Sequence, residues 1–260
     1  MVRREKSNYI IQAVAHALDV LEQFHGDGEL GVTELSKRLK LHKNNVFRIL
    51  ATLESRGYIE QNRSTENYRL GTKCLQLGQT YIQHMGLLQQ AHPIMDEIVK
   101  SCRESSYVAV MRKGQVVPLE MVEPDQPIRI VSHVGENLPL YCTAVGKVHL
   151  AFEPAEEVQR VLPDILTSHT QRTITDRHVL IEQLGAIASS GYAVDNGEYL
   201  TDVRTVAVPI KDYTRTVVGS LAVSGPAYRI PPERVEHEII PLTVKAGHEL
   251  SSRLGYNASV

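Results

Sequence analysis

The polar residues that follow position 42 have the types and the spacing that reading of DNA bases requires. Asn pairs bidentately with adenine and Arg with guanine in the major groove, and a recognition helix reads bases mainly through its N-terminal residues. Asn44, Asn45 and Arg48 are therefore the strongest candidates for base contacts. Apolar residues recur at helical spacing between these positions and would turn the polar side chains to the outer face of one helix. The side chains expected on that face are Lys43, Asn44, Asn45, Arg48 and Thr52.

A recognition helix must be held by further elements, and the segment from Thr33 to Gly71 supplies them. It reads as a short helix, a turn, a longer helix and a β-hairpin, which is the order of a winged helix-turn-helix. Gly57 suits the left-handed residue that ends a helix, and two strands would then flank a loop at residues 62–66. Arg63 lies at the tip of this wing, where it can reach phosphate or the minor groove. Small helical modules also serve as protein–protein adaptors, but the elements together favour DNA.

The length of 260 residues and a hydrophobic content of 42% favour a globular protein of two domains. Residues 1–80 hold 12 Lys and Arg against 9 Asp and Glu, whereas the remainder holds 16 against 21. A mildly basic module on an acidic remainder fits a DNA-binding head attached to a domain that does not touch DNA. No apolar run approaches the length of a membrane helix, and the charged N-terminus is not followed by a signal region. We therefore expect a cytoplasmic protein without membrane contact.

Catalytic and metal-binding patterns do not occur at usable spacing. Cys74, Cys102 and Cys142 are too far apart for a Cys-x-x-Cys site and odd in number, so reduced thiols are expected. Two His-Glu pairs in the C-terminal part lack the second histidine of a zinc-protease motif. Neither a phosphate loop nor a nucleophile elbow is complete. We expect no enzyme activity, no metal and no cofactor.

Beyond the wing the chain reads as a linker helix and then a domain that mixes strands and helices. A helical pattern over residues 73–85 is interrupted by Gly86, so the predicted division is 1–71 for the DNA-binding domain, 72–86 for the linker helix and 87–260 for the second domain. Six strands are expected in the second domain, at residues 106–111, 116–122, 128–131, 192–195, 203–209 and 217–224. Its helices are expected at residues 143–152, 155–162, 176–190 and 232–254. The mixture indicates an α+β domain with a mainly antiparallel sheet.

The chain resembles the IclR family of bacterial transcriptional regulators over nearly its whole length. The segment from Leu41 to Leu53, followed by Arg-Gly-Tyr at 56–58, is similar to the family's recognition helix and wing entry. The segment LPLYCTAVGK at 138–147 is similar to its pocket segment. The remaining blocks are GYAVDNGE at 191–198, VAVPI at 206–210 and VVGSLAVSGP at 217–226.

This resemblance implies a GAF-like C-terminal domain, with the predicted six-stranded antiparallel sheet, that binds a small organic effector. It also implies homodimers or homotetramers that bind palindromic operators in double-stranded DNA. By the same analogy the effector pocket is lined by Ala144, Val145, Asp195, Val203, Thr205, Ala222 and Ser224. The chain departs from the family pattern at Asp202, where glycine is usual, at Thr205, where cysteine is frequent, and at Ala222, where serine can contact ligand.

The chemistry of this segment favours an organic acid as effector. Backbone N–H groups at the start of the helix that follows Thr143 form a ready site for a carboxylate. Ala144 and Gly146 have an alternative explanation, which is close packing of that helix. Because Ala222 lacks a hydroxyl and Val145 is branched, an aromatic or alkyl carboxylate is favoured over a small polar keto-acid.

Two other functions stay open on the sequence alone. In one, the second domain turns over a small molecule and the first regulates it, which turnover assays would detect. In the other, the second domain only oligomerises a constitutive DNA-binding protein, and a ligand-dependent thermal shift would argue against that. The sequence does not separate a repressor from an activator, because the sign depends on where the operator lies.

Overall fold

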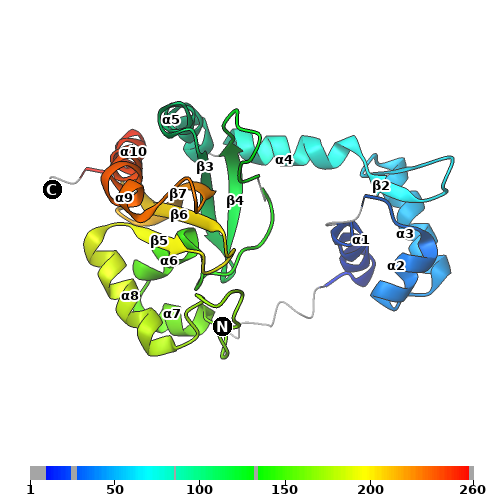
Figure 1. The fold of residues 1–260 in the computed structure, drawn as a ribbon. Coiled ribbons are helices and arrows are strands. Elements are labelled where there is room, and N and C mark those ends of the chain that lie inside the picture. Colours follow the sequence, from blue (N-terminus) through cyan, green and yellow to red (C-terminus); the bar gives the residue numbers. More distant parts are fainter. Residues whose placement is uncertain (1–9, 25–27, 85, 132–133, 258–260) are drawn as a thin grey trace. The chain divides into compact units, whose positions relative to one another are not determined.

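The computed structural model describes the chain apart from residues 1–9, 25–27, 85, 132–133 and 258–260 (Figure 1). It divides into two compact units, Met1–His84 and Met85–Val260, and each has a hydrophobic core of its own. No helix in the described part is long and apolar enough to cross a membrane.

Three helices and a hairpin form the N-terminal unit, and a fourth helix follows them. The elements are α1 (Gln12–Glu22), α2 (Val32–Leu39), α3 (Lys43–Ser55), β1 (Ile59–Gln61), β2 (Tyr68–Leu70) and α4 (Thr72–His84). Val46 and Leu50 of α3 are fully buried and join Leu35 of α2 in the core, as helical spacing of apolar residues requires. Gly57 has the predicted left-handed backbone, with φ of 76°, and turns the chain from α3 into β1. The order expected for a winged helix-turn-helix is therefore present.

The C-terminal unit is built on one antiparallel sheet in the strand order β4-β3-β7-β6-β5. Its strands are β3 (Ser105–Arg112), β4 (Gln115–Val122), β5 (Ala193–Asn196), β6 (Val203–Lys211) and β7 (Val217–Pro226). In the centre Thr205 pairs with Ser224, and Ala207 pairs with Ala222. Because side chains alternate along a strand, these four lie on the same face of the sheet.

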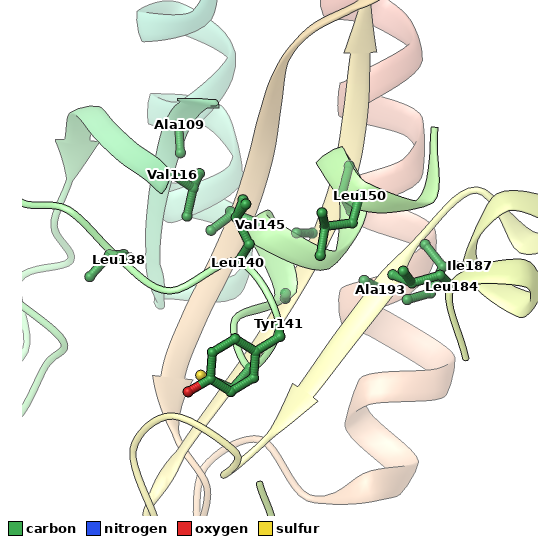
Figure 2. Close-up of a cluster of buried hydrophobic side chains, with 14 of the residues drawn as sticks. Ala109, Val116, Leu138, Leu140, Tyr141, Val145, Leu150, Leu184, Ile187 and Ala193 are labelled. Carbon is green, nitrogen blue, oxygen red and sulfur yellow. The ribbon is translucent and has the colours of Figure 1, made fainter. Parts of the chain in front are cut away.

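Helices cover both faces of this sheet (Figure 1). The helices are α5 (Gly86–Cys102), α6 (Ala144–Ala151), α7 (Ala155–Val161), α8 (Arg177–Ser190), α9 (Pro232–Arg234) and α10 (Ile240–Arg253). α5 and α10 pack on one face, whereas α6 packs on the other and is backed by α8. Figure 2 shows the resulting core, where Val145 of α6 lies near Leu140, and Leu184 and Ile187 of α8 lie near Ala193.

The expected strand at residues 128–131 is wrong, so the sheet has five strands, and not six, in the part of the chain that the structure describes. In this segment the backbone carbonyls of Ile128 and Ile130 accept hydrogen bonds from side chains and not from a neighbouring strand. Ser105 Oγ donates to the Ile130 carbonyl at 2.7 Å, and Arg229 donates to the Ile128 carbonyl at 2.7 Å. Ile130 and Val131 supply apolar wall to a cavity, which explains a strand-like composition without a strand.

The helix expected at residues 232–254 is divided into α9, a π-helical turn at Val235–Ile239, and α10. Pro241 has no backbone N–H to donate to the preceding turn, and a wider turn accommodates that loss.

Candidate functional site

Helix α3 presents the predicted DNA-facing side chains on its solvent face. Lys43, Asn44, Asn45, Arg48 and Thr52 are all exposed, whereas the apolar stripe of the same helix is buried. The hydroxyl of Thr52 donates to the Arg48 carbonyl at 2.8 Å, so it is partly engaged by its own helix. Arg63 is exposed in the loop that joins β1 to β2.

Three residues near this face were not predicted as part of it. Phe47 of α3 is 57% exposed, which is unusual for so large an apolar side chain, and such a ring can contact a thymine methyl group. Gln12 and His16 of α1 line a groove together with Asn45 and Arg48. The Nε2 atoms of Gln12 and His16 lie 2.9 Å apart. Their sequence neighbourhood is an amphipathic helix, which gives no signal that α1 borders the recognition helix.

In the C-terminal unit a cavity that is partly open to solvent lies on the α6 side of the sheet. Its polar lining is Tyr107, Thr143, Asp195, Tyr199, Thr205 and Ser224. Its apolar lining is Pro118, Met121, Ile130, Val131, Leu138, Leu200 and Val203. A mainly apolar wall with a few converging polar groups is typical of a small-molecule site.

The predicted effector residues divide into two groups. Asp195, Val203, Thr205 and Ser224 line the cavity. Ala144, Val145 and Ala222 are fully buried in the adjoining core and are not among its lining residues. Ala222 pairs with Tyr107 in the sheet, so its methyl group lies beside the cavity wall without forming it.

Two hydroxyl groups at the base of the cavity bond each other. The Oγ atoms of Thr205 and Ser224 are 2.8 Å apart on paired residues of β6 and β7. Only one of the two hydroxyl protons is used in this bond, so the pair can still donate one hydrogen bond to a ligand.

Asp195 is a buried carboxyl group that lines the cavity. Its carboxylate accepts the backbone N–H of Glu198 at 2.7 Å, yet burial dominates and raises the pKa of Asp195 to about 7. The nearby Glu198 carboxylate adds to this rise, and the Lys147 ammonium opposes it. Near neutral pH the side chain can therefore be a neutral acid that donates a hydrogen bond.

Behind Asp195 a buried ion pair joins α6 to the loop after β5. Lys147 has no exposed surface, and its ammonium donates to Glu198 Oε1. Burial nevertheless raises the pKa of Glu198, and its Oε2 atom is buried without a hydrogen-bond partner among the described residues. The sequence places Lys147 at the end of the pocket segment 138–147 but gives it no role; a lysine within the apolar run of α6 was the one available signal.

The N-terminal end of α6 faces the cavity through Thr143. The Thr143 hydroxyl caps the helix by accepting the Gly146 N–H at 3.2 Å, and it donates to the Pro139 carbonyl at 2.7 Å. Gly146 is required by packing, because a Cβ atom there would lie 2.3 Å from the Leu140 carbonyl oxygen. Capping and close packing thus both operate at this helix end.

The cavity has the chemistry of a binding site. The described residues contain no group of three or more His, Cys, Asp or Glu side chains that could hold a metal ion. Hydroxyl groups and a carboxyl group that titrates near neutrality can hold a small polar molecule, and the apolar wall can hold a hydrocarbon body.

Comparison with known proteins gives a consistent result. Residues 13–63 match the IclR helix-turn-helix domain, and residues 79–252 match the domain described as bacterial transcriptional regulator IclR C-terminal. The chain is 30% identical to the HTH-type transcriptional regulator KdgR of Escherichia coli over 248 residues, which cover 95% of this chain and 94% of that protein.

Two solved structures extend the likeness to the fold. The IclR of Thermotoga maritima is 29% identical, with a TM-score of 0.77 over 94% of this chain and 99% of that one. An IclR homologue of Microbacterium hydrocarbonoxydans, solved with 4-hydroxybenzoate, is 23% identical, with a TM-score of 0.83 over 94% and 99% of the two chains. The second likeness is one of fold alone.

Proposed function

Because the chain belongs to the IclR family of bacterial transcriptional regulators, we propose that it binds an operator through α3 and the wing, and that an organic acid in the C-terminal cavity modulates this binding. The family consists of DNA-binding regulators and not of enzymes. The exposed amide and guanidinium groups on the outer face of α3 are the observation that carries the proposal.

The proposed DNA contacts are of two kinds. Asn44, Asn45 and Arg48 read base edges, since they stand on the first turns of an exposed helix. Lys43, Thr52 and Arg63 contact the backbone and set the register without reading sequence. The operator is a palindrome bound by a homodimer or homotetramer, with half-sites about one DNA turn, ~34 Å, apart.

The proposed effector is a small acid, with an aromatic or alkyl body. Its carboxylate lies near the N-terminal end of α6, where backbone N–H groups and the helix dipole favour an anion. Thr205, Ser224 and protonated Asp195 offer hydrogen bonds, and Val203 contacts the body. The homologue solved with 4-hydroxybenzoate supports this class of ligand. Three core residues pack behind the lining residues and do not contact the effector: Ala144, Val145 and Ala222.

In this proposal residues 1–71 bind DNA, residues 72–86 link, and residues 87–260 form a GAF-like domain for effector binding and oligomerisation. The chain divides into its two observed units between positions 84 and 85, at the end of the proposed linker. A helical linker fits a role in transmitting effector binding to the operator.

Two experiments test the proposal. The first selects bound duplexes from a random library. The second titrates the protein on the selected duplex with a panel of aromatic and aliphatic acids. A palindromic consensus and a change of DNA affinity with at least one acid are expected. Val203→Phe should remove the response to the acid by filling the cavity, while DNA binding stays intact.

Val217→Phe is the matched control, because it adds the same bulk to a half-buried strand valine outside this cavity. Selection without any consensus would reject the sequence-specific function. Equal loss of response in both variants would place the effector elsewhere.

A further inference from the structure

A carboxylate outside the recognition helix holds the wing. Glu29 lies between α1 and α2, far from the wing in sequence. Its Oε1 accepts the Asn62 side-chain amide at 2.7 Å, and its Oε2 accepts the Thr65 hydroxyl at 2.8 Å. These two bonds, together with the charge of Arg69, lower the pKa of Glu29, so the carboxylate is ionised at neutral pH. The Glu29 side chain is therefore hydrogen-bonded to the loop on both sides of Arg63, at Asn62 and at Thr65.

The same two partners also order the loop internally. Asn62 Oδ1 accepts the Ser64 N–H at 2.9 Å, and the Thr65 hydroxyl accepts the Asn67 N–H at 3.3 Å. The Asn62 amide orientation is thus fixed from both ends, because its nitrogen donates to Glu29 and its oxygen accepts from Ser64. Arg63 stands between these two anchored residues and has its side chain exposed.

The negative charge of Glu29 is unfavourable for DNA binding at this position. A carboxylate beside a loop that approaches phosphate repels DNA, so its removal alone should tighten binding. Its hydrogen bonds act in the opposite direction, because a loop fixed in one conformation loses less entropy when its arginine meets a phosphate. The two effects predict opposite signs for the same substitution, which makes the role of Glu29 measurable.

We propose that Glu29 is a positioning residue for DNA binding, which tethers the wing through Asn62 and Thr65 so that Arg63 is presented to a backbone phosphate. This inference rests on the wing contact of the proposed function. The contact is with the backbone, so the effect is independent of sequence and can be measured with a duplex of arbitrary sequence.

The experiment measures DNA affinity of the full chain at several salt concentrations. Glu29→Ala should weaken binding about threefold to tenfold and lower the slope of log affinity against log salt by about one, as loss of a single phosphate contact does. Glu29→Gln should bind at least as tightly as the unmodified protein, since its amide oxygen can accept from Asn62 and its amide nitrogen can donate to Thr65. Glu22→Ala, which removes an exposed carboxylate from α1, is the matched control and should cause no loss.

A double-mutant cycle separates positioning from general stability. In an Arg63→Ala background, Glu29→Ala should cause no further loss, because the contact that it positions is gone. Thr65→Val keeps the charge and removes one of the two bonds; it should also weaken binding, which keeps the test open if Glu29→Ala unfolds the domain. Thermal melts of each variant show whether the fold is intact.

The outcomes are distinct. Unchanged or tighter binding by Glu29→Ala, with Arg63→Ala still weakened, overturns the tether. So does a loss for Glu29→Ala that is equally large without Arg63. If Arg63→Ala itself leaves affinity and salt dependence unchanged, the wing contact of the proposed function is wrong, and the positioning role falls with it.

Discussion

At the scale of single residues, Asn45 and Arg48 stand nearly one turn apart on the exposed face of α3. We expect Asn45→Ala or Arg48→Ala to lower affinity for the selected operator by about 1–3 kcal/mol and to leave affinity for scrambled DNA nearly unchanged. Titrations of both duplexes at one salt concentration measure this. An equal loss on both duplexes would assign these side chains to backbone contacts instead.

Asp195 predicts how stability depends on pH. Folding raises its pKa from 3.8 to about 7, so the folded state favours the protonated form. The contribution of this carboxyl is complete below about pH 4 and is lost as pH rises through 7, at roughly 1.4 kcal/mol per pH unit in between. Asp195→Asn stays neutral and still offers an oxygen to the Glu198 N–H. Urea unfolding between pH 5 and 8 should show wild type losing stability relative to this variant, and parallel curves would contradict the prediction.

At the scale of elements, α6 is fixed by one glycine. A Cβ atom at Gly146 would overlap the backbone of Leu140, which cannot move as a side chain can. We expect Gly146→Ala to lower the free energy of unfolding by about 1–3 kcal/mol. Gly185→Ala in α8 is the control, because nothing lies within 4 Å of its Cβ position and alanine favours a helix by about 0.5–1 kcal/mol. Denaturant unfolding of both should give opposite signs; the same sign would reject the packing argument.

The elements also show why sequence predicts some features and not others. The N-terminal helices and the wing were predictable, because a period of apolar residues and Gly57 define them locally. Residues 128–131 have the composition of a strand, but their carbonyls are bonded by side chains distant in sequence. For the same reason the ion pair of Lys147 and Glu198 was missed, since only the fold brings 147 and 198 together.

At the scale of the whole molecule, effector and operator must influence each other equally. If an acid changes operator affinity by some factor, operator DNA changes affinity for that acid by the same factor. We expect calorimetry with the acid, with and without the selected duplex, to return the factor measured in DNA titrations. Unequal factors would mean that the acid acts through aggregation or a second site.

We propose Gly86 as the hinge that carries this coupling. It is the first described residue of α5, and no side chain lies within 4 Å of the position that its Cβ would take. Proline fixes φ there, so it removes the freedom of the hinge that we propose between the linker helix and the C-terminal unit. We expect Gly86→Pro to bind both the acid and the operator with near wild-type affinity while both coupling factors fall to about one. Gly86→Ala, which keeps φ adjustable, is the control and should retain coupling. Full coupling in the proline variant would show that the signal does not depend on motion at residue 86.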